Sequence, residues 1–341
     1  MSCLPERITL FCNRALLPAC WKAEASKGPV WCFNPTLLRQ ADRWIFAYRV
    51  VLPDQRRRIA ACLLNDAFEI VDGSQVPVSD TIKFDERPQY SERVTTWFAD
   101  PRLYAVKGNI NLYFNSGWHE PRNHQFVVAL DENLFPTLGP AKEIDLLQPC
   151  KSLEKNWVFL ADTLGDLVYS PDPHLLAQFV GEQDGRLLYS LLPATQSTPA
   201  VCPKEKIYLP EIKPTAELYS NKTYLVRGGA PPVRRGSFYY SFCHAISTNE
   251  ELPSYRACVY RFSALAPYAL VDQTYSMLEV SLPKESTRTH PPLNPAVAEV
   301  VYPCGAALLG KSWHVACGLN DERCAIVTFD SEKLEASLGV V

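Results

Sequence analysis

The chain has 341 residues, 47% of them hydrophobic and 21% charged, and its formal net charge at pH 7 is −3. This composition is typical of a globular protein with a hydrophobic core and excludes a largely disordered chain. The small negative charge provides no basic field for nucleic acid or an anionic membrane, and no run approaches the ~18 apolar residues of a membrane-spanning helix.

The N-terminus and the cysteines indicate the cellular compartment of the protein. Residues 1–7 include a glutamate and a proline where a secretory signal peptide needs a basic start and an apolar run. The twelve cysteines are scattered singly, without a Cys-x-x-Cys pair, and several lie in apolar runs where a thiol packs as a small hydrophobic side chain. We therefore expect a soluble cytoplasmic protein with free thiols, no metal and no cofactor.

Short apolar or aromatic runs, separated by Gly, Asp, Asn and Pro, recur along the chain and predict strands. In chain order the clearest runs are 44–48, 59–64, 110–114, 125–130, 237–242 and 258–262. Helical periodicity is confined to short pieces near the termini, such as 331–337. The sequence therefore predicts an all-β protein.

The predicted strands fall into five groups that share one pattern, in which a strand with a polar end is followed by further strands and turns. The groups lie near residues 32–71, 97–135, 155–192, 223–264 and 300–330. Four-stranded sheets placed around an axis avoid long exposed edges. We therefore predict a five-bladed β-propeller that occupies residues 1–341 as a single domain, with polar strand ends converging at one mouth of a central pocket.

Asp100 is the strongest candidate for chemistry, since it lies beside Arg102 at the mouth of an apolar strand. A carboxyl group there is a candidate general acid or base for transfer at an acetal carbon, where the departing oxygen needs a proton. The alternative interpretation is an Asp that caps the turn before Pro101.

Cationic and amide side chains end the neighbouring groups. Arg49, Arg102 and Lys155 are candidates to hold a phosphate, a diphosphate or sugar hydroxyls, and the alternative is ion pairing between blades. Asn156 follows Lys155 and is placed to orient a sugar ring. The arginine run 56–58 is interpreted as a solvated turn, and the alternative is a site for a polyanion.

Three further residues complete the candidate site. Arg227 precedes two glycines that permit close backbone approach, and His244 ends the following strand pair as either a ligand or a structural donor. Asp321 is a second carboxylate, from the last group, and is a candidate for contact with sugar hydroxyls or for a base. The alternative interpretation is that Asp321 only forms part of a hairpin turn.

Several short motifs occur, in order over residues 32–330, as they do in one known family. They are Asn34-Pro35-Thr36 leading to Tyr48-Arg49, Ala99-Asp100-Pro101-Arg102, Lys155-Asn156-Trp157, Arg227-Gly228-Gly229 before His244, and Gly318-Leu319-Asn320-Asp321. Together they resemble glycoside hydrolase family 130, which comprises β-mannoside phosphorylases and some hydrolases on five-bladed β-propellers.

The resemblance implies that Asp100 donates a proton to the glycosidic oxygen while phosphate attacks from the opposite face with inversion. Asp321 would hold sugar hydroxyls, and four residues would line the phosphate and sugar subsites: Arg49, Arg102, Lys155 and His244. Two departures from the family pattern are Ala99, where a glutamate is usual, and Lys155-Asn156-Trp157, where an Arg-Asn signature is usual.

We therefore expect an inverting enzyme that acts on β-mannoside-like glycosides as a phosphorylase or a hydrolase. Its partners would be a carbohydrate and inorganic phosphate or a sugar nucleotide, with no nucleic acid and no membrane span. One alternative is a glycosyltransferase that uses a sugar nucleotide. The other is a propeller without catalysis that binds a glycan or a protein at the same mouth.

Overall fold

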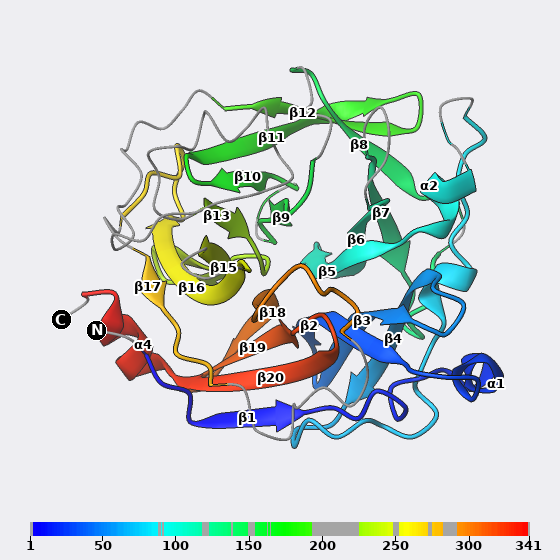
Figure 1. Ribbon diagram of the computed structural model, residues 1–341. Helices are drawn as coiled ribbons and strands as arrows, with labels where there is room; N and C mark the ends of the chain where they lie inside the picture. The colour runs from blue at the N-terminus through cyan, green and yellow to red at the C-terminus, as the bar shows by residue number, and fades with distance from the viewer. Residues whose placement is uncertain are drawn as a thin grey trace.

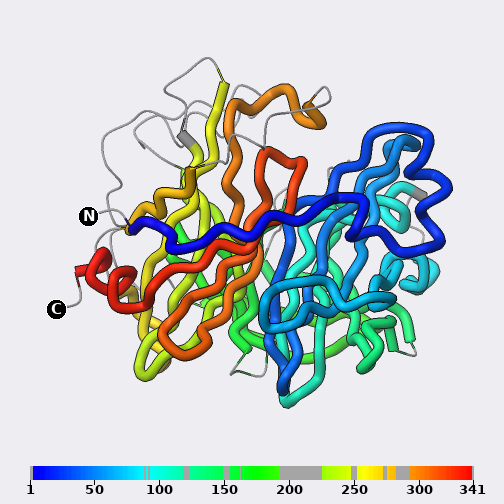
Figure 2. The backbone as a smooth tube through the Cα atoms, turned by 90° about the horizontal axis from the view of Figure 1, so that it is seen from below, coloured from blue at the N-terminus to red at the C-terminus, as the bar shows by residue number. Residues whose placement is uncertain are grey.

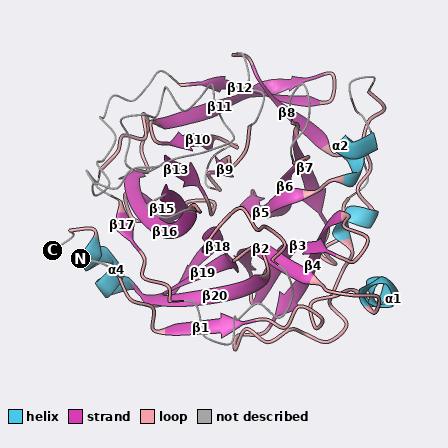
Figure 3. Ribbon diagram, viewed as in Figure 1, coloured by secondary structure: helices cyan, strands magenta, loops and turns pink. Residues whose placement is uncertain are grey.

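The structure is a computed structural model dominated by strands, and the all-β prediction is confirmed (Figure 3). It describes residues 3–87, 90, 92–117, 123–137, 139–148, 154–161, 163, 165–192, 225–247, 252–271, 275–281 and 292–339. The helices are short: α1 (Lys22–Ala25), α2 (Glu92–Thr96), α4 (Ser331–Ser337) and the 3-10 turns Ala19–Trp21 and Val78–Asp80. The predicted helix at 331–337 is present.

The strands form antiparallel groups that follow one another along the chain, which we number as blades 1 to 5. Blade 1 contains β2 (Trp31–Gln40), β3 (Arg43–Val51) and β4 (Arg57–Leu64). Blade 2 contains β5 (Ala99–Val106), β6 (Asn109–Asn115), β7 (Gln125–Leu130) and β8 (Lys142–Leu146). Blade 3 contains β9 (Val158–Phe159), β10 (Leu167–Pro171), β11 (His174–Gln183) and β12 (Arg186–Leu191).

Blade 4 contains β13 (Leu225–Gly228), β14 (Val233–Arg235), β15 (Phe238–Ser247), β16 (Ser254–Ser263) and β17 (Ser276–Met277). Blade 5 contains β18 (Val301–Leu309), β19 (Ser312–Leu319), β20 (Arg323–Asp330) and β1 (Arg7–Leu10). The parallel pairing of β8 with β12 joins blades 2 and 3 into one sheet. The count of five blades is our interpretation of this strand order, and the single-domain organisation of 1–341 stays a prediction.

The blades stand around a common centre, with the first strand of each blade innermost (Figure 1). A hydrophobic cluster fills each junction between successive blades, including the one between blade 5 and blade 1. At that closing junction Phe46 and Tyr48 pack in the same cluster as Ala316 and Ile326. The apolar contact therefore runs around the whole ring, and burial of this surface is the main force that holds it closed.

Strand β3 explains why the strands read as continuous apolar runs. Phe46 belongs to the cluster between blades 5 and 1, whereas its neighbour Ala47 belongs to the cluster between blades 1 and 2. Successive side chains of a strand point to opposite faces, and both faces of this strand are covered by a neighbouring blade. Polar residues are consequently found mainly at the ends of the strands.

The N-terminal strand β1 completes blade 5, which sequence reasoning had built only from residues 300–330. It pairs antiparallel with β20, placing Arg7 opposite Thr328, and the two run side by side in Figure 2. This pairing joins the two ends of the chain within one sheet.

The ten described cysteines are free, and eight of them are buried. The Sγ atoms of Cys243 and Cys258 lie 3.2 Å apart, at hydrogen-bond distance, on paired strands. Cys150 and Cys202 lie outside the described residues. In the described part of the chain, no helix is long and apolar enough to cross a membrane.

Candidate functional site

Asp100 lies in a β-bulge of the innermost strand of blade 2. The pairing of β5 with β6 shifts register between Ala99 and Arg102, and Asp100 has a φ of 50°. Asp and Asn adopt this left-handed conformation more readily than other residues with a side chain, and a bulge turns a side chain away from its regular direction. The local sequence therefore gives Asp100 an irregular position at the centre of the ring.

Asn34 occupies the matching position on β2 of blade 1, where sequence reasoning assigned no role. The register of β2 against β3 shifts between Phe33 and Thr36, and Asn34 has a φ of 49°. Its Nδ2 donates a hydrogen bond of 2.9 Å to Oδ1 of Asp100. The available signal was that both residues precede a proline at the start of an inner strand.

Asp100 is an ionised carboxylate among cations. Burial alone would raise its pKa, but the charges of Arg49, Arg102 and Lys155, together with the Asn34 hydrogen bond, lower the pKa below its ordinary value. Nη1 of Arg49 lies 3.6 Å from Oδ1 of Asp100, and each side chain is 14% exposed. The structure thus brings four of the sequence-predicted residues together.

Arg102 is fully buried and contacts protein groups through each of its nitrogens. Nη1 donates to the Pro101 carbonyl at 2.9 Å, Nη2 donates to the Tyr302 hydroxyl at 2.9 Å, and Nε donates to the Gly229 carbonyl. In this geometry Arg102 does not reach outward as the predicted substrate ligand. It supports Asp100 through its charge.

Asn156 is also held by the protein rather than pointed at an open space. The Tyr302 hydroxyl that accepts from Arg102 donates in turn to Oδ1 of Asn156. A side chain at Gly228 would place Cβ 2.0 Å from the Asn156 carbonyl oxygen, so only glycine permits this approach of blade 4 to blade 3. Asn156 therefore fixes the blade junction beside Lys155.

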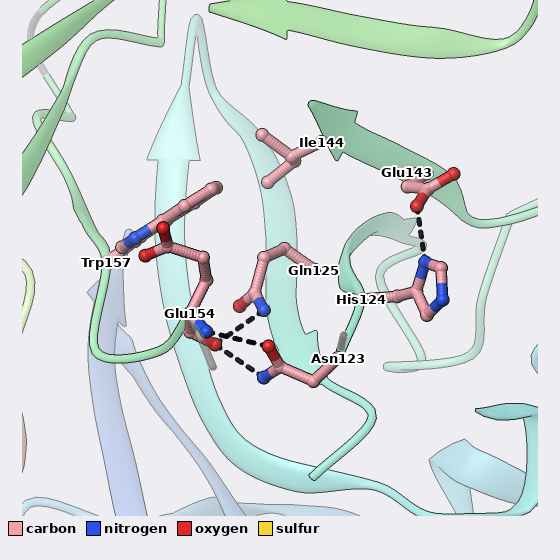
Figure 4. Close-up of a pocket in the computed structure, with 7 residues that line it drawn as sticks. All are labelled: Asn123, His124, Gln125, Glu143, Ile144, Glu154 and Trp157. Atoms are coloured by element: carbon pink, nitrogen blue, oxygen red, sulfur yellow. Dashed lines mark hydrogen bonds and ion pairs between the residues drawn. The ribbon is translucent and has the colours of Figure 1, made fainter. Parts of the chain in front are cut away.

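Lys155 is presented by a short segment that two amide side chains clamp. Nδ2 of Asn123 and Nε2 of Gln125 donate to the carbonyl of Glu154, and the amide N–H of Glu154 donates to Oδ1 of Asn123 at 2.7 Å (Figure 4). The Gln125 bond is 2.7 Å long. This arrangement fixes the backbone immediately before Lys155.

The Lys155 side chain itself is exposed, although the surrounding ring restricts its hydration. That desolvation lowers the pKa of its ammonium group, with Arg227 and Arg49 acting in the same direction. The nearby carboxylates Asp100 and Asp321 oppose the shift. Lys155 therefore lies among both signs of charge and is open to a ligand.

Arg227 and His244 lie opposite each other on β13 and β15 of blade 4. His244 is buried, and burial together with the charges of Lys155, Arg102 and Arg227 places its pKa well below the ordinary value. Its ring is neutral at pH 7 and packs edge-on against Tyr302 at 4.4 Å, and no described residue forms a hydrogen bond with its Nδ1.

Asp321 belongs to the turn after β19 of blade 5 and has a φ of 55°. It accepts a hydrogen bond of 3.1 Å from Nδ2 of Asn294. Burial raises its pKa, and the Asp100 charge adds to this rise against Asn294, Arg49 and Lys155. The two carboxyl groups of the site are therefore shifted in opposite directions.

These side chains form what we name the central cluster. Its members act on one another electrostatically and come from all five blades: Arg49, Asp100, Lys155, Arg227, His244 and Asp321. In the described ranges, no group of His, Cys, Asp and Glu is arranged to hold a metal ion.

The interpretation of 56–58 as a solvated turn is wrong for Arg57 and Arg58, which begin strand β4. Arg56 is exposed and Arg58 pairs with Asp54 at 2.5 Å, but the Arg57 guanidinium lies over the Trp97 ring, 5.0 Å from its centroid. Residues of a strand alternate between faces, so Arg57 and Arg58, the first two residues of β4, point to opposite faces, Arg57 over Trp97 and Arg58 over Trp21.

The fold is that of solved glycoside hydrolase and phosphorylase structures. A β-1,2-mannobiose phosphorylase from Listeria innocua matches with a TM-score of 0.57 and 12% identity over 98% of this chain and 100% of that chain. A putative glycosidase from Bacteroides thetaiotaomicron matches with a TM-score of 0.57 and 15% identity over 97% and 93% of the two chains.

A third structure represents the GH130 family of mannoside phosphorylases, described as containing hydrolases that target β-1,2-mannosidic linkages in Candida mannan. It has a TM-score of 0.56 and 12% identity over 89% of this chain and 85% of that chain. No family model and no curated protein sequence matches this chain. The family resemblance inferred from the motifs is confirmed at the level of the fold.

Proposed function

We propose that this protein is a carbohydrate-active enzyme that transfers a glycosyl group with inversion from a β-mannoside-like glycoside to phosphate at the central cluster. The observation that carries this proposal is the excess of cations around Asp100. Arg49, Arg102 and Lys155 act on the Asp100 carboxylate, and Arg227 acts on Lys155 beside them, although the whole chain has a net charge of −3. A site of this charge favours an anionic co-substrate.

Lys155, Arg227 and His244 are the proposed phosphate ligands. They come from neighbouring blades 3 and 4, and the Lys155 side chain is exposed. Neutral His244 offers a ring nitrogen, Nδ1, that no group in the described ranges uses. Two cations and one imidazole suit the three oxygens of a phosphate that is turned toward them.

Asp100 is the proposed proton-transfer group. A phosphate oxygen forms a bond to the anomeric carbon while the glycosidic C–O bond breaks, and the departing oxygen takes a proton from Asp100. Because the lowered pKa makes the resting group a carboxylate, the proton must arrive with the substrates. Dihydrogen phosphate supplies it and retains an oxyanion as the nucleophile, so the step balances.

Hydrolysis is the second candidate, and Asp321 is the observation that favours it. Its pKa is raised while that of Asp100 is lowered, which is the pattern of an acid paired with a base. In an inverting hydrolase one carboxylate activates water while the other carboxyl group protonates the departing oxygen. Asp100 would then be the base and Asp321 the acid.

The test is product analysis with β-mannobiose substrates in the presence and absence of inorganic phosphate. Release of α-mannose 1-phosphate only with phosphate supports the phosphorylase. Release of free mannose without phosphate replaces it by the hydrolase. Transfer from GDP-mannose, or glycan binding without turnover, would instead favour the transferase or the non-catalytic propeller.

A further inference from the structure

Arg57 carries guanidinium donors that no described protein group uses. Among the described residues, its Nε and Nη1 atoms have no hydrogen-bond partner, and both are shielded from solvent. Nε of Arg49 likewise is shielded and has no partner in the described part of the chain. Shielded donors without a partner cost free energy and are uncommon in native proteins, so a pair of them beside a reactive site calls for a ligand.

The two arginines lie on one face of blade 1. In the pairing of β3 with β4, Arg49 lies opposite Ile59 and Val51 lies opposite Arg57. Directly opposed residues of an antiparallel pair share a face, and alternate residues of one strand do too. Arg49 and Arg57 are therefore diagonal neighbours on the face that turns toward blade 2.

Among the described residues, only the Arg49 half of this pair has an ion-pair partner. Burial lowers the pKa of Arg57 to about 10, the Arg49 charge adds to the decrease, and Asp321 only partly opposes it. Arg49 has Asp100 at 3.6 Å, whereas Arg57 forms no ion pair among the described residues. An anion bound between the guanidinium groups would relieve their repulsion.

Trp97 sets the position of Arg57 without occupying its donors. Two guanidinium groups lie over the indole ring, with Arg57 at 5.0 Å and Arg93 at 4.5 Å from the ring centroid. Gly117 packs against the indole edge, where a Cβ would lie 2.2 Å from Nε1. A cation–π contact uses the face of the guanidinium and leaves its in-plane N–H groups for an oxyanion.

Arg49 and Arg57 come from another blade than the proposed phosphate ligands, although Arg49 is close enough to Lys155 to lower its pKa. Lys155 and Arg227 belong to blades 3 and 4, which lie across the ring from blade 1, and Asp100 belongs to blade 2 between them (Figure 1). A sugar held at Asp100 would therefore have a cationic group on either side.

We propose that Arg49 and Arg57 form a second anion subsite, which binds a carboxylate or phosphate group carried by the sugar substrate itself. The subsite thus favours an acidic or phosphorylated sugar over the neutral sugar of the same structure. The inference rests on the proposed function only in taking the ligand to be a sugar. Free phosphate would use the Lys155 side of the site.

The experiment measures binding by calorimetry of mannose, mannuronate, mannose 6-phosphate and inorganic phosphate to the full chain, to Arg57→Gln and to Arg56→Gln. Arg56 is the matched control because it is the adjacent, exposed arginine. Since a hydrogen bond to a charged group contributes about 1.5–3 kcal/mol, we expect at least about tenfold tighter binding of one acidic sugar than of mannose. Arg57→Gln should lose this preference and Arg56→Gln should retain it.

Equal affinity of the wild-type protein for mannose and both acidic sugars would overturn the subsite, as would a full preference in Arg57→Gln. If Arg57→Gln does not fold, Arg57→Lys keeps the charge but not the forked donors and should lose at least about threefold of the preference. Weaker binding of inorganic phosphate, with the acidic-sugar preference unchanged, would also overturn it by placing Arg57 in the phosphate site.

The result separates the two proposals. An acidic-sugar preference that depends on Arg57, in a protein without phosphate-dependent turnover, would refute phosphorolysis and leave the subsite standing. Phosphate-dependent turnover of neutral β-mannosides, without a preference for acidic sugars, would support phosphorolysis and refute the subsite.

Discussion

Replacement of Asn34 by aspartate tests whether the inner-strand bulges control the ionisation of Asp100. The change keeps the shape of the side chain and suits the φ of 49°, but it replaces the 2.9 Å donor with a second carboxyl group. Loss of a hydrogen bond to a charged acceptor costs about 1.5–3 kcal/mol, which is about 1–2 pKa units.

The added charge contributes more. At about 4 Å and an effective dielectric constant of about 20, two unit charges interact by about 4 kcal/mol, or about 3 pKa units. Arg49 reduces this effect because it lies 3.6 Å from Asp100. We therefore expect the carboxyl pair in Asn34→Asp to show an upper apparent pKa at least about 3 units above that of Asp100 in the wild type.

The assay is carbon NMR of the aspartate carboxyl groups during a pH titration, together with the pH dependence of kcat/KM. Asn34→Gly is the matched control, because it accepts the same φ and removes the donor without adding charge, so its shift should be about 1–2 units. An upper pKa in Asn34→Asp that stays within half a unit of the control would refute the reasoning.

Three other predictions follow from the same geometry. His244 is buried, and its pKa lies below its unfolded value. Its contribution to stability is therefore present above about pH 6.5 and is lost as the pH falls. In denaturant unfolding measured over a pH series, His244→Asn should reduce this loss of stability at low pH. Gly228→Ala places a Cβ against the Asn156 carbonyl and should lower the free energy of unfolding by about 1–3 kcal/mol. Gly181→Ala is the control, because a Cβ there meets open space, and it should change this free energy by less than about 1 kcal/mol. Thermal unfolding of both variants measures the difference. Asn123→Ala removes two hydrogen bonds that hold the backbone before Lys155. It should weaken phosphate binding about 3- to 30-fold in calorimetry and leave most secondary structure intact. Unchanged phosphate affinity would contradict the role of Asn123 in positioning Lys155.

The strand content was predictable from the sequence because most strands are buried on both faces. Phe46 and Ala47 pack into different clusters, so β3 reads as an unbroken apolar run. Strand β1 was not predictable in the same way. It has four residues and its partner β20 lies at the other end of the chain, so no local pattern specifies the pairing.

The candidate site was predictable in its charged members but not in their surroundings. Asp100 and Lys155 do meet in the central cluster, since polar ends of inner strands converge. The burial of Arg102 could not be read from its residue type, because it depends on contacts with Gly229 and Tyr302 from distant blades. The inward position of Arg57 was not predicted, because it lies within a run of three arginines. The alternation of side chains along strand β4 could have indicated it.

Phosphate-dependent turnover by Asp100→Asn tests the central claim most directly. The substitution removes the proton carrier with little change of shape, and general acid catalysis typically contributes about 10²- to 10⁴-fold in rate. With β-mannobiose and phosphate, the wild-type protein should release α-mannose 1-phosphate, and Asp100→Asn should lose at least about 100-fold in kcat while it still binds phosphate. Wild-type turnover by Asp100→Asn would contradict the account.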